Sequence, residues 1–170
     1  LPDLAQEILD TIVREVPEYA RPLEGSFGRG IRIGVDQALK QFVDLVGRLD
    51  ASVAKVAGTG FVVTPMVRLD VPGEREVLGK VETANVGGSH KARHLFGLLL
   101  FDEVERIAHP TSDRPPLAIA SCGNAALAAA VLSRAVNRAL EVFVPVDADP
   151  VVVAELAQLG ATIVTCARTD

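Results

Sequence analysis

The last part of the chain, residues 116–166, alternates short Val-rich apolar runs with helical stretches. This pattern predicts strands at 116–120, 141–145 and 161–166, and helices at 124–139 and 150–159. Each helical stretch is long enough to return the chain to the start of a neighbouring parallel strand. The alternation therefore predicts an α/β fold in which a parallel sheet is built from βαβ crossovers.

The stretch before this alternation has a different organisation. Three short apolar runs predict strands at 61–64, 66–71 and 76–82, with a turn at Pro72 and Gly73 between the second and the third. A helix is expected from about Ser89 to Ala108. We therefore expect one α/β domain over residues 51–170.

Residues 1–50 are helical in pattern. Apolar residues fall at four-residue steps from Leu4 to Val16, until Pro17 ends the run. A second apolar stripe at helical spacing extends from Phe27 to Leu49. We expect an N-terminal helical hairpin, whose ordinary role would be packing or dimerisation.

Charge and composition exclude several classes of partner. The net charge is -5, whereas nucleic acids and anionic membranes require a clustered basic face. No apolar run is long enough to span a bilayer, and no signal peptide is visible. The two cysteines have no further ligands at metal-binding spacing. We expect a cytoplasmic protein with no nucleic-acid partner, no membrane contact and no metal site.

One lysine stands in an unusual position. The chain has only four lysines, and Lys91 follows directly behind Gly87, Gly88 and Ser89. If a helix begins at Ser89, Lys91 lies in its first turn, where the helix dipole and any partial burial disfavour the ammonium. A neutral amine is nucleophilic and can form an imine with an aldehyde cofactor. Taken alone, the same residues also fit an ordinary loop with a solvated lysine.

A second loop lies at the carboxyl end of the strand predicted at 116–120. Ser121, Cys122, Gly123 and Asn124 lead from this strand into a helix of small residues. Ligands of open α/β sheets bind at this edge, and the amides of a helix N-terminus can bind a carboxylate. The alternative is a plain turn in which Ser and Asn only cap the helix.

Four motifs occur in a fixed order: TPMVRL at 64–69, NVGGSHKAR at 85–93, SCGNAALAAA at 121–130, and EVFVPVDADPVVVAELAQLGATIV at 141–164. Together they resemble the N-terminal half of the fold type II pyridoxal-phosphate-dependent enzymes. This superfamily includes tryptophan synthase β, cysteine synthase, threonine synthase and serine dehydratase. The resemblance covers about residues 57–168.

This resemblance implies pyridoxal 5'-phosphate as the cofactor and Lys91 as the catalytic Schiff-base lysine, which also moves the α-proton. It implies that Asn124 contacts the phenolic oxygen of the cofactor. The substrate carboxylate would bind to Ser121, Cys122, Gly123, Asn124 and Ala125. The implied reaction is β-elimination or β-replacement on a small amino acid. Ala92 and Cys122 depart from the residues common in the family.

Members of the superfamily continue into a glycine-rich loop that holds the cofactor phosphate, whereas the only glycine after residue 130 is Gly160. We therefore expect an incomplete N-terminal portion, whose site is completed in a homo-oligomer or by a second chain. Residues 1–50 also resemble the N-terminal helices of purine-catabolism-type (PucR/CdaR-like) transcriptional regulators. The alternative function is thus a non-catalytic, regulator-like or interaction module that retains an α/β relic.

Overall fold

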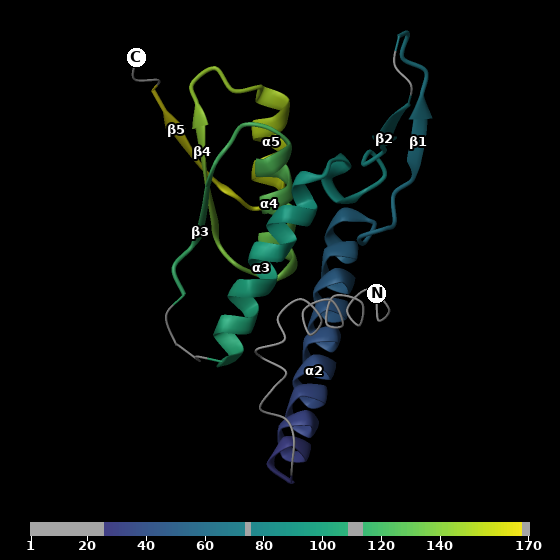
Figure 1. Ribbon diagram of the computed structural model, residues 1–170. Coiled ribbons are helices and arrows are strands. Elements are labelled where there is room, and N and C mark those ends of the chain that lie inside the picture. Colours follow the sequence, from purple (N-terminus) through teal and green to yellow (C-terminus); the bar gives the residue numbers. More distant parts are fainter. Residues whose placement is uncertain (1–25, 74–75, 109–113, 168–170) are drawn as a thin grey trace. The chain divides into compact units, whose positions relative to one another are not determined.

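The structure is a computed structural model that describes residues 26–73, 76–108 and 114–167 (Figure 1). The chain divides into two compact units, Leu1–Arg48 and Leu49–Asp170, and each is considered by itself. The helix expected before Pro17 lies outside the described residues. The division of the chain at residues 50 and 51 therefore stays a prediction.

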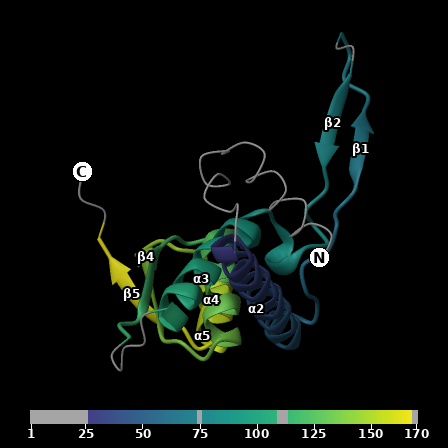
Figure 2. The same cartoon turned by 60° about the horizontal axis from the view of Figure 1, so that its bottom comes forward.

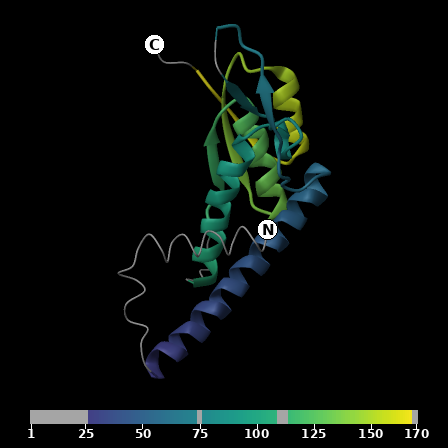
Figure 3. The same ribbon diagram turned by 45° about the vertical axis from the view of Figure 1, so that its right-hand side comes forward.

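Helix α2 (Ser26–Ala57) is the long helix drawn in purple and blue in Figure 3, and it contains the apolar stripe from Phe27 to Leu49. The prediction that it stops near Leu49 is wrong, because the helix continues to Ala57. Its last turns contain good helix formers, and Val53 is fully buried there. The helix ends where Gly58 adopts a φ of +77°, a conformation that glycine allows.

Strands β1 (Met66–Leu69) and β2 (Val77–Lys80) form an antiparallel pair in which Met66 lies opposite Lys80. The strand expected at 61–64 is absent from the structure. Side chains, and not a neighbouring strand, form hydrogen bonds with backbone groups of this segment. The Phe61 amide donates to Asp50 Oδ1 at 2.7 Å, and the Val62 carbonyl accepts from Arg93 at 2.6 Å.

The parallel sheet predicted for the last part of the chain is confirmed. Its strands lie in the order β3 (Leu117–Ala120), β4 (Leu140–Pro145), β5 (Thr162–Cys166), and all are parallel. Helices α4 (Asn124–Ala135) and α5 (Pro150–Gln158) make the two crossovers. Both cover the same face of the sheet (Figures 1 and 2). The fold class is therefore α/β, as expected.

The boundaries of these crossover helices follow local chemistry. Asp149 caps α5, since its side chain accepts from the Val151 amide at 2.8 Å, and Gly160 follows the helix with a φ of +88°. Helix α4 ends at Ala135, four residues before the expected end at 139. Asn137 has a φ of +53° and turns the chain out of the helix.

Helix α4 lies between two apolar clusters. One faces the sheet and α5, and the other faces α3 (Lys91–Ala108) and the end of α2. The buried α4 residues facing the sheet are Ala126 and Ala130, and those facing α3 are Ala128, Val131 and Leu132. Small side chains allow both neighbours to approach closely. The N-terminus of α4, and the loop that enters it, are thereby fixed by packing on both sides.

Candidate functional site

The lysine loop runs through a short 3-10 turn, η3 (Val86–Gly88), into α3. Lys91 is the first residue of α3, which confirms its position in the first turn of a helix. Its amide lies 3.4 Å from Ser89 Oγ, which accepts the hydrogen bond and caps the helix start. The Lys91 side chain is exposed and not partly buried.

Both glycines of the loop have conformations that favour glycine. Gly87 has a φ of +65° and Gly88 a φ of +64°. A Cβ at Gly87 would lie 3.7 Å from the Cβ of Ala128. The glycine pair therefore serves two purposes: it turns the chain sharply, and it seats the loop directly against α4.

The second loop enters α4 from strand β3. The Ser121 amide extends the sheet by donating to the Phe143 carbonyl at 3.2 Å. Gly123 is the N-cap residue of α4, and no side chain caps the helix there. The Leu127 amide makes the first helical bond, to the Gly123 carbonyl at 3.1 Å. The amides of Asn124, Ala125 and Ala126 thus precede the first helical bond, which is the arrangement that binds anions.

Exposure of the residues in this second loop fits a ligand-binding edge. Asn124 and Cys122 are exposed, whereas Ser121, Gly123 and Ala125 are half-buried. Cys122 is a free thiol. A Cβ added at Gly123 would meet no other atom within 4 Å. The loop therefore offers polar groups to a ligand without a side chain filling the space above Gly123.

The two loops meet on the same helix. Ala128, against which Gly87 packs, lies four residues beyond Asn124, about 6 Å along the helix axis. The structure thereby brings the lysine loop to within about one helical turn of the uncapped end of α4. That Lys91, Asn124 and residues 121–125 act on one ligand stays a prediction.

Sequence reasoning missed a carboxylate beside the lysine loop. Glu82 follows β2 and accepts hydrogen bonds from Thr64, Asn85 and Arg93. The hydrogen bond from Thr64, together with Arg93 and Asn85, lowers the pKa of Glu82, against an opposing effect of desolvation. Glu82 lies beyond the end of β2 at Lys80, so the alternation of the strand gives no signal for it.

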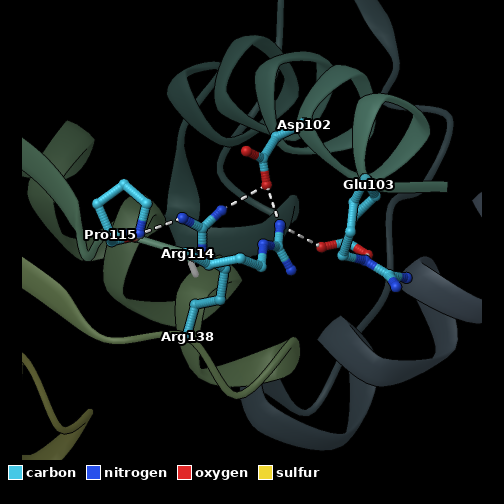
Figure 4. A network of polar contacts seen from close by, with 6 residues as sticks. Asp102, Glu103, Arg114, Pro115 and Arg138 are labelled. Atoms are coloured by element: carbon cyan, nitrogen blue, oxygen red, sulfur yellow. Dashed lines mark hydrogen bonds and ion pairs between the residues drawn. The ribbon is translucent and has the colours of Figure 1, made fainter. Parts of the chain in front are cut away.

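A second polar cluster, also missed, lies near the amino ends of the strands (Figure 4). Asp102 pairs with Arg114 and Arg138, while Glu103 Oε1 accepts from Arg114 at 2.9 Å. Glu103 Oε2 also pairs with Arg106 at 2.9 Å. Arg114 precedes β3 and Arg138 precedes β4, so this cluster is at the opposite end of the sheet from the loop at Ser121.

None of the helices in the described ranges is long and apolar enough to cross a membrane. No group of three His, Cys, Asp or Glu side chains among those residues could hold a metal ion.

Comparison with known families gives the class of the protein. Residues 58–170 match the pyridoxal-phosphate dependent enzyme family, and residues 1–61 match the PucR-like N-terminal domain. Because the first match covers more than half of the chain, the chain belongs to the pyridoxal-phosphate dependent enzyme family. Its cofactor is pyridoxal 5'-phosphate. Both resemblances seen in the sequence are thereby confirmed.

Solved structures support the fold. A pyridoxal 5'-phosphate-dependent aspartate racemase has a TM-score of 0.54 and 23% identity, covering 74% of this chain and 37% of its own. O-ureido-L-serine synthase has a TM-score of 0.51 and 22% identity, covering 68% of this chain and 35% of its own. An O-acetylserine dependent cystathionine beta-synthase from Helicobacter pylori has a TM-score of 0.51 and 20% identity, covering 68% of this chain and 37% of its own.

The chain thus spans little more than a third of the length of these structures. No curated protein matches the chain.

Proposed function

We propose that this chain carries the lysine half of a pyridoxal-phosphate enzyme that performs β-elimination or β-replacement on a small amino acid. One observation carries the proposal: an exposed lysine starts α3, and its loop packs on α4 about one turn from uncapped amides. These groups would supply a primary amine for the cofactor aldehyde and an anion site about one helical turn away.

The residues present fit the cofactor of the family. Lys91 supplies a primary amine that could hold the aldehyde carbon, and its side chain is accessible. Asn124 is exposed at the helix start and offers both a donor and an acceptor to a ring oxygen. When bound, pyridoxal phosphate provides an electron sink for negative charge at the α-carbon of an amino acid.

The remaining tasks belong to side chains and amides of this chain. The free amides of Asn124, Ala125 and Ala126, with the Ser121 hydroxyl, would bind and orient the substrate carboxylate. The Lys91 amine, when free, would act as a general base and accept the proton from the α-carbon of the substrate. Cys122 would lie beside the carboxylate, where it can influence which side chains of the substrate fit.

Residues 1–170 supply only part of the proposed site. The chain spans only 35% of the length of O-ureido-L-serine synthase, and residues 131–170 contain one glycine, Gly160. A glycine-rich cradle for the cofactor phosphate would therefore come from other residues. We propose that a homo-oligomer or a second chain supplies it.

The test uses the full chain and measures where the cofactor attaches. Pyridoxal phosphate is added, borohydride fixes any adduct as a secondary amine, and peptide mass spectrometry locates it. We expect one adduct at Lys91, absent in Lys91→Arg and unchanged in Lys55→Arg, since Lys55 is an exposed lysine on α2. Equal labelling of wild type and Lys91→Arg would contradict the proposal.

A second candidate function rests on the match of residues 1–61 to the PucR-like N-terminal domain. In this reading the chain is a regulator-like interaction module, and its α/β part only packs and dimerises. Light scattering with and without pyridoxal phosphate separates the two. If the cofactor and Lys91→Arg leave self-association unchanged, and no adduct forms at Lys91, the interaction module is the favoured function.

A further inference from the structure

Three side chains from separate parts of the chain converge on the carboxylate of Glu82. The Thr64 hydroxyl donates to Oε1 at 2.6 Å, while Asn85 Nδ2 and Arg93 Nε donate to Oε2 at 3.0 and 2.9 Å. Thr64 lies 18 residues before Glu82, and Arg93 lies 11 residues after it. One carboxylate therefore ties the segment before β1 to the first turn of α3.

The residues bound to Glu82 flank the lysine. Asn85 begins the lysine loop, Arg93 lies two residues beyond Lys91, and every residue between them belongs to the loop or to the helix start. Arg93 is held a second time, because its NH2 group donates to the Val62 carbonyl at 2.6 Å. Both ends of the segment that carries Lys91 are thus attached to the same acid.

Burial distinguishes this arrangement from an ordinary surface ion pair. Thr64 and Asn85 are each 3% exposed, and the Glu82 side chain is 13% exposed. Asn85 Oδ1 is buried without a hydrogen-bond partner in the described residues, so Glu82 is the group that holds this side chain. Three hydrogen bonds to one charged, mostly buried acceptor are stronger and more specific in geometry than an exposed pair.

The loop between the two ends needs such an attachment. Gly87 and Gly88 give the backbone many conformations to lose, and the Lys91 side chain is exposed. Precise placement of a reacting amine depends on supporting groups whose own positions are fixed.

We propose that Glu82 is a positioning residue for Lys91, acting through Asn85 and Arg93 on the two ends of the lysine loop. The inference rests on the proposed function, since it assigns a role toward the amine that would hold the cofactor. Glu82 touches neither substrate nor cofactor in this role.

Two variants of α3 test the role, because two arginines on this helix pair with acids in similar ways. Arg93 Nε lies 2.9 Å from Glu82 and Arg106 Nε lies 2.9 Å from Glu103, with side chains 39% and 43% exposed. Arg93→Met removes the bonds to Glu82 and to the Val62 carbonyl, whereas Arg106→Met removes a bond to Glu103 far along the helix. Glu82→Gln removes the charge from the shared acceptor.

The first readout is amide hydrogen exchange of residues 85–91, which needs no cofactor. We expect exchange roughly tenfold faster in Arg93→Met and Glu82→Gln, with α5 unchanged, and no change at 85–91 in Arg106→Met. A merely structural role would accelerate exchange in α5 as well. Thr64→Val removes one donor to Glu82 and keeps the shape of the side chain, so exchange at 85–91 should rise by a smaller factor. This variant replaces the others if they fold poorly.

The second readout is the rate at which pyridoxal phosphate attaches to Lys91. We expect this rate to fall roughly tenfold in Arg93→Met and to stay at the wild-type value in Arg106→Met. If wild type attaches cofactor at Lys91 and both readouts are unchanged in Arg93→Met and Glu82→Gln, the positioning role is wrong and the proposed function stands. If exchange accelerates but wild type attaches no cofactor, the proposed function fails instead.

Discussion

Gly87 shows how one residue can determine the geometry of the lysine loop. Its φ is +65°, and the nearest atom to an added Cβ is that of Ala128 at 3.7 Å. Contact at this distance is ordinary, so the cost of a side chain here arises from the backbone conformation and not from a clash. The backbone conformation, and not a steric clash, is therefore the expected cause of any loss of stability.

We expect Gly87→Ala to lower the free energy of unfolding by roughly 1–2 kcal/mol, the cost of a left-handed conformation in a residue with a Cβ. Urea denaturation measures it. The matched control is Gly97→Ala, which lies inside α3 with open space around it. That variant should be neutral or more stable by up to about 1 kcal/mol. The same loss at both positions would contradict the argument.

The pH dependence of Glu82 is a second prediction for a single residue. Its pKa is lowered by the Thr64 hydroxyl, Arg93 and Asn85. A carboxylate with a lowered native pKa stabilises the fold above its unfolded value, and this contribution is lost as the pH falls through the native value. Glu82→Gln should therefore destabilise the protein at pH 7, and the difference from wild type should shrink below the ordinary value of 4.5. A difference that grows with acidity would refute it.

At the scale of elements, α2 shows where sequence patterns fail. Its stripe predicts a helix to Leu49, but the shift to glycine and proline only begins at Gly58. Residues 51–57 contain no glycine or proline, so nothing in this stretch ends the helix before Gly58. The final turns are fixed by a tertiary contact of Val53, which a single sequence does not reveal.

Val53 is completely buried in the cluster shared with Val86, Leu99 and Ala128. Val53→Ala removes two methyl groups and leaves a cavity, so we expect a loss of roughly 2 kcal/mol of unfolding free energy. Lys55→Ala, an exposed change two residues away, should alter it by less than about 0.5 kcal/mol. Thermal unfolding of the two variants compares them, and equal stability would show that the last turns of α2 do not belong to this core.

The start of α5 was predictable because its signals are local. Asp149 followed by Pro150 is a helix start in the sequence, and the Asp149 side chain accepts from the Val151 amide in the structure. The early end of α4 has a local signal too, in Asn137, but asparagine enters the left-handed region only in some contexts.

Removing the cap of α5 gives a prediction of moderate size. Asp149→Ala should cost about 1 kcal/mol, because the Val151 amide loses its acceptor, whereas Asp149→Asn should cost a few tenths at most. Chemical denaturation of the three proteins measures both differences. If asparagine is as damaging as alanine, the carboxylate acts through its charge and not as a cap.

At the scale of the whole molecule, the order of strands and helices from 116 to 166 is enough to predict the parallel sheet, because crossover length and handedness leave few topologies. The site is less predictable. Lys91 and Asn124 are separated by 33 positions, and only the packing of Gly87 on α4 shows that their loops adjoin. Contacts between side chains distant in sequence, such as those of Glu82, have no periodic signal at all.

The two polar clusters of this unit lie against different parts of the fold. The Glu82 cluster adjoins the lysine loop, whereas Asp102 and Glu103 tie α3 to the residues that precede β3 and β4 (Figure 4). The Glu103 side chain is 7% exposed and bonds both Arg106 and Arg114. Removing Glu103 takes the carboxylate from Arg106 and one of two carboxylates from Arg114, which still pairs with Asp102.

Glu103→Ala should therefore lower the free energy of unfolding by roughly 2 kcal/mol, the cost of lost hydrogen bonds to a charged group. Glu155→Gln, at an exposed position on α5, should change it by less than about 0.5 kcal/mol. At a temperature where Glu103→Ala is still folded, its attachment of pyridoxal phosphate at Lys91 should match wild type, because the strand ends that carry the Ser121 loop are held by other contacts. Loss of attachment in a folded Glu103→Ala protein would mean that the two ends of the sheet are coupled.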